Sequence, residues 1–188
     1  MIMLEIKGTA VTAIRDYVKA NHPQRFSEWM EALPESSKDI FSGVIDSSKW
    51  YPLEEGGVVP TRKTADLFFR GNYEKGAWEA GKYSAEKGLT GIYKIFVKAS
   101  SPAYIIQRAT RVFATYYQPC KMEVIEKKEH AVILQVSDMP ESDIVIEYRI
   151  AGWMEKALEI SGAKSVSIQF PKSIAKGDEV TIFSITWE

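Results

Sequence analysis

The C-terminal part of the chain carries the pattern that most restricts what it can fold into. Met122 and Val124 alternate with charged residues, and Val132, Leu134 and Val136 alternate with Ile133 and Gln135, which predicts two antiparallel strands joined by a short hairpin. Apolar residues then recur at helical spacing from about residue 141 to 161, and alternation returns around 166–170 and 180–187. Because one long helix separates two strand pairs, it has to cross a face of the sheet that they share. The expected order is therefore strand, strand, helix, strand, strand, in a four-stranded and largely antiparallel sheet.

The preceding part, residues 1–118, has helical rather than alternating periodicity. Its predicted helices cover residues 9–21, 26–33, 40–45, 61–70, 74–87 and 102–116, with a short apolar segment at 92–97. Ser101 is expected to cap the last of these helices, because it directly precedes a proline. Glycines and a proline between residues 46 and 60 predict a loop or a broken helix. We therefore predict one α+β domain over residues 1–188, with an N-terminal helical layer over 1–118 and a sheet with one long helix over 119–188.

The charge balance bears on the possible partners. The chain has 188 residues, of which 24 are basic and 25 acidic, and its formal net charge is -1. Nucleic acid is therefore not expected as the main partner, because phosphate binding needs a net basic face. A low net charge weakens the repulsion between copies, and abundant aromatic residues can form a contact, so we expect a homodimer through the helical part.

The cysteine count and the apolar segments bear on the compartment. Cys120 is the only cysteine, so neither an internal disulfide nor a cysteine-based metal site can form. A lone thiol is typical of a reducing compartment. The first residues lack a basic region followed by a long apolar run, and no apolar segment approaches the roughly 18 residues that span a bilayer. We therefore expect a cytoplasmic protein without a membrane span.

Motifs for catalysis and metal binding are absent from the sequence. It has no nucleophile elbow, phosphate-binding loop, dinucleotide fingerprint, HExxH or CxxC motif. His22 precedes a proline and His130 falls in the predicted hairpin turn, and neither has a partner at metal-ligand spacing. We therefore predict no catalytic residue, no metal and no cofactor.

The helix predicted at residues 74–87 has an unusually shallow face. Gly81 and Ser84 leave room beside Trp78 on this face. A glycine within a helix costs about 1 kcal/mol relative to alanine, so Gly81 needs a reason. Two reasons remain open, namely the close approach of another helix and space for a ligand.

The long helix carries the best polar candidate of the chain. Glu147 falls within its apolar arc, next to Tyr148. It is either a pocket carboxylate that holds a ligand or a proton, or a group that reaches solvent or pairs with an arginine. Aromatic residues in the helical part suit a pocket wall, an ordinary core or a dimer contact. The predicted ligand-binding residues are Trp78, Gly81, Phe113, Tyr116, Glu147 and Tyr148.

Short motifs over almost the whole chain resemble one bacterial family. They are Gly8-Thr9-Ala10-Val11, Trp50-Tyr51-Pro52, Gly91-Ile92-Tyr93, Ser101-Pro102, Tyr116-Tyr117, Gly152-Trp153, and Gly177-Asp178 before a strand that ends at Trp187. The sequence resembles a family of uncharacterised bacterial proteins that are multiplied as paralogues in fruiting-body-forming gliding bacteria. That family resembles the superfamily of ligand-binding domains in nitric-oxide signalling and Golgi transport. This superfamily includes haem nitric-oxide-binding domains, the 4-vinyl reductase domain and small subunits of the TRAPP tethering complex.

The resemblance implies the same strand order, an apolar cavity between helices and sheet, and a tendency to dimerise. Two departures from it concern the cofactor. Haem nitric-oxide-binding domains carry a Tyr-x-Ser-x-Arg motif, and the nearest segment here, residues 148–152, reads Tyr-Arg-Ile-Ala-Gly. The 4-vinyl reductase domain commonly has cysteines beside its Gly-Asp turn, and residues 174–183 contain none. A haem site and a cysteine-based metal site are therefore not expected.

Three functions remain open from the sequence. The first is a small-molecule-binding sensory or regulatory domain, non-enzymatic, with an apolar ligand between the helices and the sheet. The second is an interaction or dimerisation module without a ligand. The third, with less support, is an enzyme that acts on a hydrophobic or tetrapyrrole substrate.

Overall fold

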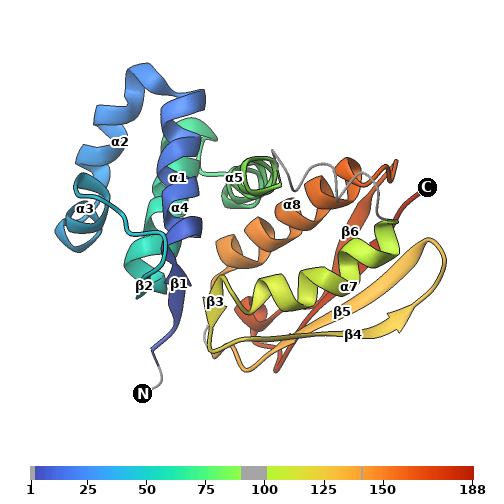
Figure 1. The fold of residues 1–188 in the computed structure, drawn as a ribbon. Helices are drawn as coiled ribbons and strands as arrows, with labels where there is room; N and C mark the ends of the chain where they lie inside the picture. Colours follow the sequence, from blue (N-terminus) through green and yellow to red (C-terminus); the bar gives the residue numbers. More distant parts are fainter. Residues whose placement is uncertain (1–2, 90–100, 141) are drawn as a thin grey trace.

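A computed structural model describes residues 3–89, 101–140 and 142–188 of the chain. Helices α1 to α4 gather around a small sheet at one end, and a larger sheet with α7 and α8 forms the other end (Figure 1). The apolar segment predicted at 92–97 lies outside the described residues. The elements of the first part are β1 (Glu5–Lys7), α1 (Gly8–Asn21), η1 (Pro23–Arg25), α2 (Phe26–Ala32), α3 (Glu35–Ser42), β2 (Trp50–Pro52), η2 (Glu54–Val58), α4 (Val59–Phe68), α5 (Tyr73–Gly88) and α7 (Pro102–Phe113).

The second part contains the sheet that the sequence predicts. Its elements are β3 (Tyr117–Gln118), β4 (Lys121–Lys127), β5 (Ala131–Ser137), α8 (Ile144–Ile160), β6 (Ser167–Lys172), η3 (Ile174–Lys176) and β7 (Thr181–Thr186). Four of these strands form a sheet in the order β4-β5-β7-β6, and every neighbouring pair is antiparallel. The predicted α+β fold class, with its strand, strand, helix, strand, strand order, is confirmed.

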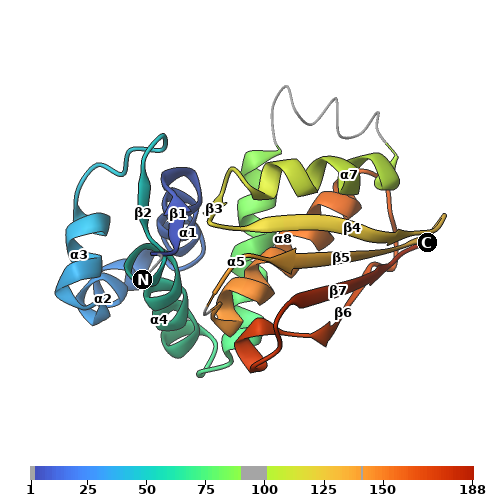
Figure 2. The ribbon, with the colours of Figure 1, turned by 90° about the horizontal axis from the view of Figure 1, so that it is seen from below.

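Helix α8 crosses one face of this sheet and is buried on several sides. Figure 1 shows it over the sheet with α5 and α7 beside it, and Figure 2 shows the same arrangement from below. Alternate residues of the strands point toward the helix, so Leu134 and its cross-strand partner Phe183 are both fully buried. Ile146 and Ile150 of α8 belong to the same core cluster. A helix enclosed in this way needs apolar residues over most of its circumference, as the sequence of α8 shows.

A second, three-stranded sheet has no counterpart in the sequence prediction. Its order is β2-β1-β3, so Ile6 of β1 pairs with Tyr51 on one side and with Tyr117 on the other. Strand β2 and the π-helical turn η2 occupy the segment for which the sequence predicts a loop or broken helix. Because β3 directly follows α7, this pairing ties the second part of the chain to the first.

Side-chain hydrogen bonds cap the starts of α7 and α8, where the sequence supplies a capping residue. Ser101 caps α7 as predicted, because its Oγ accepts a hydrogen bond from the backbone N–H of Tyr104. Helix α8 starts later than predicted, at Ile144, since the side chain of Asp143 accepts a hydrogen bond from the N–H of Val145. Among the described residues, none of the helices combines the length and apolar character that a bilayer crossing requires.

Candidate functional site: a cavity between α5, α7 and α8

The walls of the candidate site depend on a very close contact between α5 and α8. A Cβ on Gly81 would collide with the carbonyl oxygen of Arg149, and a Cβ on Gly152 would collide with that of Trp78. The absence of side chains at both glycines lets the two backbones touch. Of the two reasons left open for Gly81, the structure shows the close approach of another helix.

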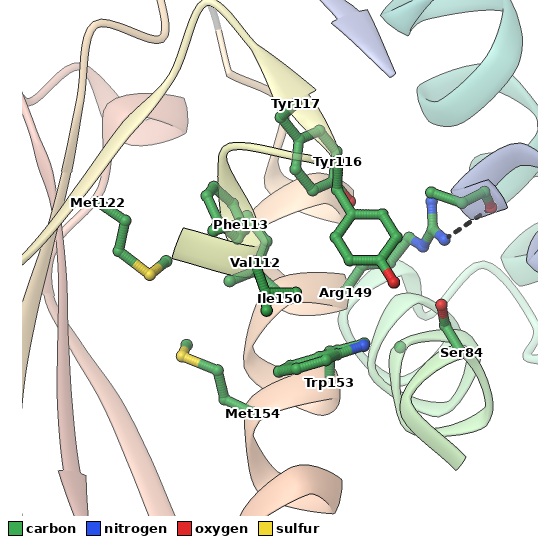
Figure 3. A pocket seen from close by; sticks show the side chains of 12 residues that line it. Ser84, Val112, Phe113, Tyr116, Tyr117, Met122, Arg149, Ile150, Trp153 and Met154 are labelled. Carbon is green, nitrogen blue, oxygen red and sulfur yellow. Dashed lines mark hydrogen bonds between the residues drawn. The ribbon is translucent and has the colours of Figure 1, made fainter. Parts of the chain in front are cut away.

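An apolar cavity opens beside this contact. It has a volume of about 30 Å³ and lies between α1, α5, α7, α8 and β4 (Figure 3). One water needs about 10–15 Å³ of such volume, so this space holds one or two waters as it stands. Its wall consists of Ala10, Gly81, Ser84, Val112, Phe113, Tyr116, Tyr117, Met122, Arg149, Ile150, Trp153 and Met154.

The main polar group of this wall is the buried side chain of Arg149. The residue is 3% exposed, and its Nε and Nη1 have no hydrogen-bond partner within the described part of the chain. Its Nη2 donates to the carbonyl oxygen of Ala10 at 3.4 Å, which is longer than the usual range of about 2.7–3.2 Å. Burial lowers the pKa of Arg149, and burial likewise raises the pKa of the neighbouring phenol of Tyr117. The guanidinium therefore lies behind the cavity wall, beside α1, with no accessible surface on Nε or Nη1, and the described protein atoms hardly pair it.

A wider groove adjoins the cavity. It has a volume of about 580 Å³ and shares Ser84, Val112, Tyr116 and Trp153 with the cavity wall. Two further polar atoms in residues of this groove, Nε1 of Trp153 and Oγ1 of Thr12, are buried and have no hydrogen-bond partner among the described residues. In Figure 3, Nε1 of Trp153, Oγ of Ser84 and the hydroxyl of Tyr116 lie on the same side of the cavity as Arg149. Small-molecule sites typically have about 300–1,000 Å³, so cavity and groove together have a suitable size.

Five of the six predicted ligand-binding residues fall into two groups. Gly81, Phe113 and Tyr116 lie together on the cavity wall. Trp78 and Tyr148 lie elsewhere, with their ring centroids 5.9 Å apart, and Nε1 of Trp78 donates to Glu155.

Glu147, the sixth predicted residue, is buried but does not line the cavity. It is 1% exposed and neither reaches solvent nor pairs with an arginine. Its carboxylate accepts hydrogen bonds from Oγ of Ser173 at 2.6 Å, Oγ1 of Thr181 at 2.6 Å and the backbone N–H of Ala175 at 3.1 Å. Glu147 therefore anchors the connection between β6 and β7 against α8.

The sequence analysis missed Arg149, the residue that most distinguishes the site. A signal existed, because Arg149 lies between Tyr148 and Ile150 in the apolar centre of the long helix. An arginine in such a position is ordinarily expected to extend to solvent along its methylene groups. The structure places it inward, between α1 and α5.

Comparison with solved structures shows which known fold the chain has. No protein-family model matches the sequence, and no curated protein matches it either. An H-NOX protein from S. oneidensis in the Fe(II)NO ligation state superposes with a TM-score of 0.74 at 14% identity, over 97% of this chain and 99% of that chain. The chain has the H-NOX fold. An unliganded Fe(II) H-NOX protein from K. algicida has a TM-score of 0.71 at 13% identity, over 97% of each chain. An oxygen-binding H-NOX domain related to soluble guanylate cyclases has a TM-score of 0.61 at 12% identity, over 96% and 92% of the two chains.

The residues of this chain do not fit a haem held by histidine in the cavity of the H-NOX fold. His22 stacks on Phe68 with ring centroids 3.9 Å apart, and His130 lies in the β4–β5 turn near Trp187. Neither histidine belongs to the cavity wall, and the cavity is far smaller than a macrocycle. Burial raises the pKa of the Cys120 thiol to about 12, so the thiolate that would bind iron is disfavoured. Within the described residues, no group of three or more histidine, cysteine or acidic side chains could hold a metal ion.

Proposed function

We propose that this chain is a small-molecule-binding sensory or regulatory domain that holds an apolar ligand between α5, α7 and α8. The ligand is not haem, and the domain does not catalyse a reaction. In this proposal it belongs to the bacterial family that its sequence motifs resemble. It acts in the cytoplasm and forms a homodimer through its helical part.

The observation that carries the proposal is the wall of the cavity. Its surface is almost wholly apolar, and it shares Ser84, Val112, Tyr116 and Trp153 with the wider groove. An apolar space of this kind between packed helices supports an apolar ligand. Among the structures with the same fold, one is in the Fe(II)NO ligation state and another is an oxygen complex.

The chemistry of the wall supports binding rather than catalysis. Among the described residues, the wall of the cavity has no histidine, cysteine or carboxylate that could act as a nucleophile or a general base. Its tyrosines are poor bases near neutral pH, because burial raises the pKa of both Tyr116 and Tyr117 above the ordinary value of 10.0.

The test is binding of a neutral apolar probe, with native mass spectrometry of the purified protein beside it. We expect saturable 1:1 binding of N-phenyl-1-naphthylamine by fluorescence, or a small molecule retained in the native spectrum. Ser84→Leu places an apolar side chain where cavity and groove meet and should abolish probe binding. Glu86→Leu introduces the same side chain at an exposed position of α5 and should leave binding unchanged. A protein that retains no small molecule and does not bind the probe, but is a stable dimer, would favour the interaction module instead.

A further inference from the structure

Exposed apolar side chains gather on α7 and β4. Among the described residues, large apolar side chains are exposed at five positions, and three of these, Tyr104, Val124 and Ile125, lie on these two elements. The chain reverses direction between α7 and β4, and the helix runs alongside the strand (Figures 1 and 2). Tyr104, near the start of α7, and Ile125, near the end of β4, therefore lie toward the same end of the pair.

The exposed side of α7 is positively charged. Arg108 and Arg111 are exposed and fall on the same side of the helix as Tyr104. Nη1 of Arg108 donates to the hydroxyl of Tyr104 at 3.1 Å, and neither arginine forms an ion pair with a described carboxylate. Helix α7 contains no acidic residue, and residues 87–122 contain six basic and no acidic residues. This part of a chain with a net charge of -1 therefore attracts negative charge.

The carboxylates of β4 do not offset this charge. Glu123 forms an ion pair with Lys121 at 3.0 Å, and Glu126 forms one with Lys128 at 2.6 Å. The acidic groups of the strand are thus already neutralised by lysines beside them, which leaves the arginines of α7 available to an outside partner.

Strand β4 is also an open edge of the larger sheet. It is the first strand in the order β4-β5-β7-β6, and every residue of β4 except Met122 is exposed. Among the described residues, β4 forms a ladder only with β5, and a bulge between Val124 and Glu126 interrupts it. The regular part of the edge is therefore residues 121–124. The edge on the other side of the sheet, β6, contains Pro171, whose nitrogen cannot donate to an added strand.

We propose that this α7/β4 surface, formed by Tyr104, Arg108, Arg111, Val124 and Ile125, binds an extended acidic segment of a partner protein. The segment adds a strand to the edge of β4, its carboxylates pair with the arginines, and its apolar side chains contact Val124 and Ile125. An open strand edge serves a peptide backbone and not a phosphate backbone, so the geometry favours a protein over a nucleic acid. None of the five residues lines the cavity, so the surface is a second site that does not depend on a ligand there.

The experiment uses three peptides that carry the same neutral dye. The first alternates glutamate and valine, the second has lysine in place of glutamate, and the third is the first with every backbone nitrogen methylated. We expect the acidic peptide to bind about tenfold or more tightly than the lysine peptide at low ionic strength, because only its charges complement the arginines. The methylated peptide should bind weakly, since it cannot donate to the strand edge. Fluorescence anisotropy gives the affinities, and added salt should lower that of the acidic peptide.

Three variants connect the binding to this surface. Arg108→Gln/Arg111→Gln should weaken binding of the acidic peptide about tenfold, because it removes both charges. Ile125→Ser should also weaken it, because it removes an exposed apolar contact. The control, Arg70→Gln/Lys75→Gln, removes two charges from exposed positions of α5 and its preceding turn and should bind the peptide like wild type. All three variants should bind N-phenyl-1-naphthylamine like wild type, since none of the changes touches the cavity wall.

The possible outcomes distinguish the partners that could occupy this surface. Equal affinities for the acidic and lysine peptides, or no binding of either, would overturn the acidic partner. Equal affinities for the acidic and methylated peptides would overturn strand addition. Tighter binding of a single-stranded oligonucleotide, lost in Arg108→Gln/Arg111→Gln, would assign the surface to nucleic acid instead. A wild-type dimer that becomes monomeric in Ile125→Ser, measured by light scattering, would assign it to a second copy of the chain.

Discussion

Gly81 of α5 and Gly152 of α8 form a reciprocal contact in which each glycine lies against the backbone of the other helix. Gly81 meets the backbone of Arg149, and Gly152 meets the backbone of Trp78. The two helices therefore approach as closely as their main chains permit. This contact also holds the turn of α8 that carries Arg149 at the edge of the cavity.

A methyl group at either glycine should destabilise the protein. Gly81→Ala and Gly152→Ala each force the helices apart at a contact with backbone, which cannot rotate away as a side chain can. We expect each change to lower the free energy of unfolding by about 1–3 kcal/mol, although alanine is the better helix former. Urea denaturation monitored by circular dichroism measures the difference.

The control for this prediction lies on the same helix. Among the described residues, a Cβ on Gly88 would have only the hydroxyl of Tyr116 near it, at 3.7 Å, so Gly88→Ala should be neutral or slightly stabilising. The double variant Gly81→Ala/Gly152→Ala should cost less than the sum of the single changes, because one separation of the helices relieves both clashes. Additive losses would show that the two glycines do not share one contact.

Local patterns in the sequence were sufficient to predict β4, β5, α8, β6 and β7. Alternation and helical spacing are properties of neighbouring residues, and the sheet arises from them directly. Strands β1, β2 and β3 have two or three residues each, too few for alternation to appear. They exist because Ile6 pairs with Tyr51 and Tyr117, which are distant in the sequence. Such pairing is decided by packing of the whole chain.

The candidate site was predictable only in part, for a related reason. Phe113 and Tyr116 lie on an apolar stripe, and the sequence shows that stripe. The inward direction of Arg149 depends on where α1 lies, since its hydrogen-bond partner among the described residues is the carbonyl oxygen of Ala10. The sequence marks Glu147 as unusual, but the donors that surround it come from Ser173, Ala175 and Thr181, far along the chain.

Glu147→Gln should loosen the connection between β6 and β7. The amide nitrogen of glutamine cannot accept the hydrogen bonds that a carboxylate oxygen takes from Ser173 or Thr181, so at least one buried donor loses its partner. We expect a loss of about 1–3 kcal/mol in the free energy of unfolding. The rate of backbone amide hydrogen exchange should rise in residues 173–181.

The matched control is Glu179→Gln, an exposed carboxylate in the same connection, which should change stability by less than about 0.5 kcal/mol. If Glu147→Gln left exchange at residues 173–181 unchanged and altered only ligand binding, Glu147 would be a ligand residue rather than an anchor.

Asp143 combines two contacts at the start of α8. Its Oδ1 accepts from the N–H of Val145 at 2.9 Å, while its Oδ2 accepts from Nη2 of Arg62 on α4 at 2.8 Å. Asp143→Ala removes both contacts and should cost about 1–2 kcal/mol. Asp143→Asn keeps a capping oxygen and loses the ion pair, which is partly exposed, so it should cost less than about 1 kcal/mol. Equal losses of thermal stability for Asp143→Asn and Asp143→Ala would show that the ion pair, which both variants lose, dominates over the cap.

Tyr17 should make the fold sensitive to alkaline pH. Its side chain is buried at 6% exposure, and this burial, with the nearby carboxylate of Glu79, raises its pKa from 10.0 to about 12. The folded protein therefore holds the phenolic proton more firmly than the unfolded chain does. The contribution to stability is complete below about pH 10 and is lost as the pH rises toward about 12.

Tyr17→Phe removes this titration and should reduce the fall in unfolding free energy between about pH 9 and pH 11.5. The pKa values of Tyr148 and Cys120 are also raised to about 12. The wild-type slope of unfolding free energy against pH therefore contains contributions from several groups, and only the difference between wild type and Tyr17→Phe reports on Tyr17. Tyr104→Phe, at a residue that is 47% exposed, serves as the control and should follow the wild-type curve. Urea denaturation across this pH range gives the slopes, and identical slopes for Tyr17→Phe and wild type would mean that Tyr17 ionises equally in both states.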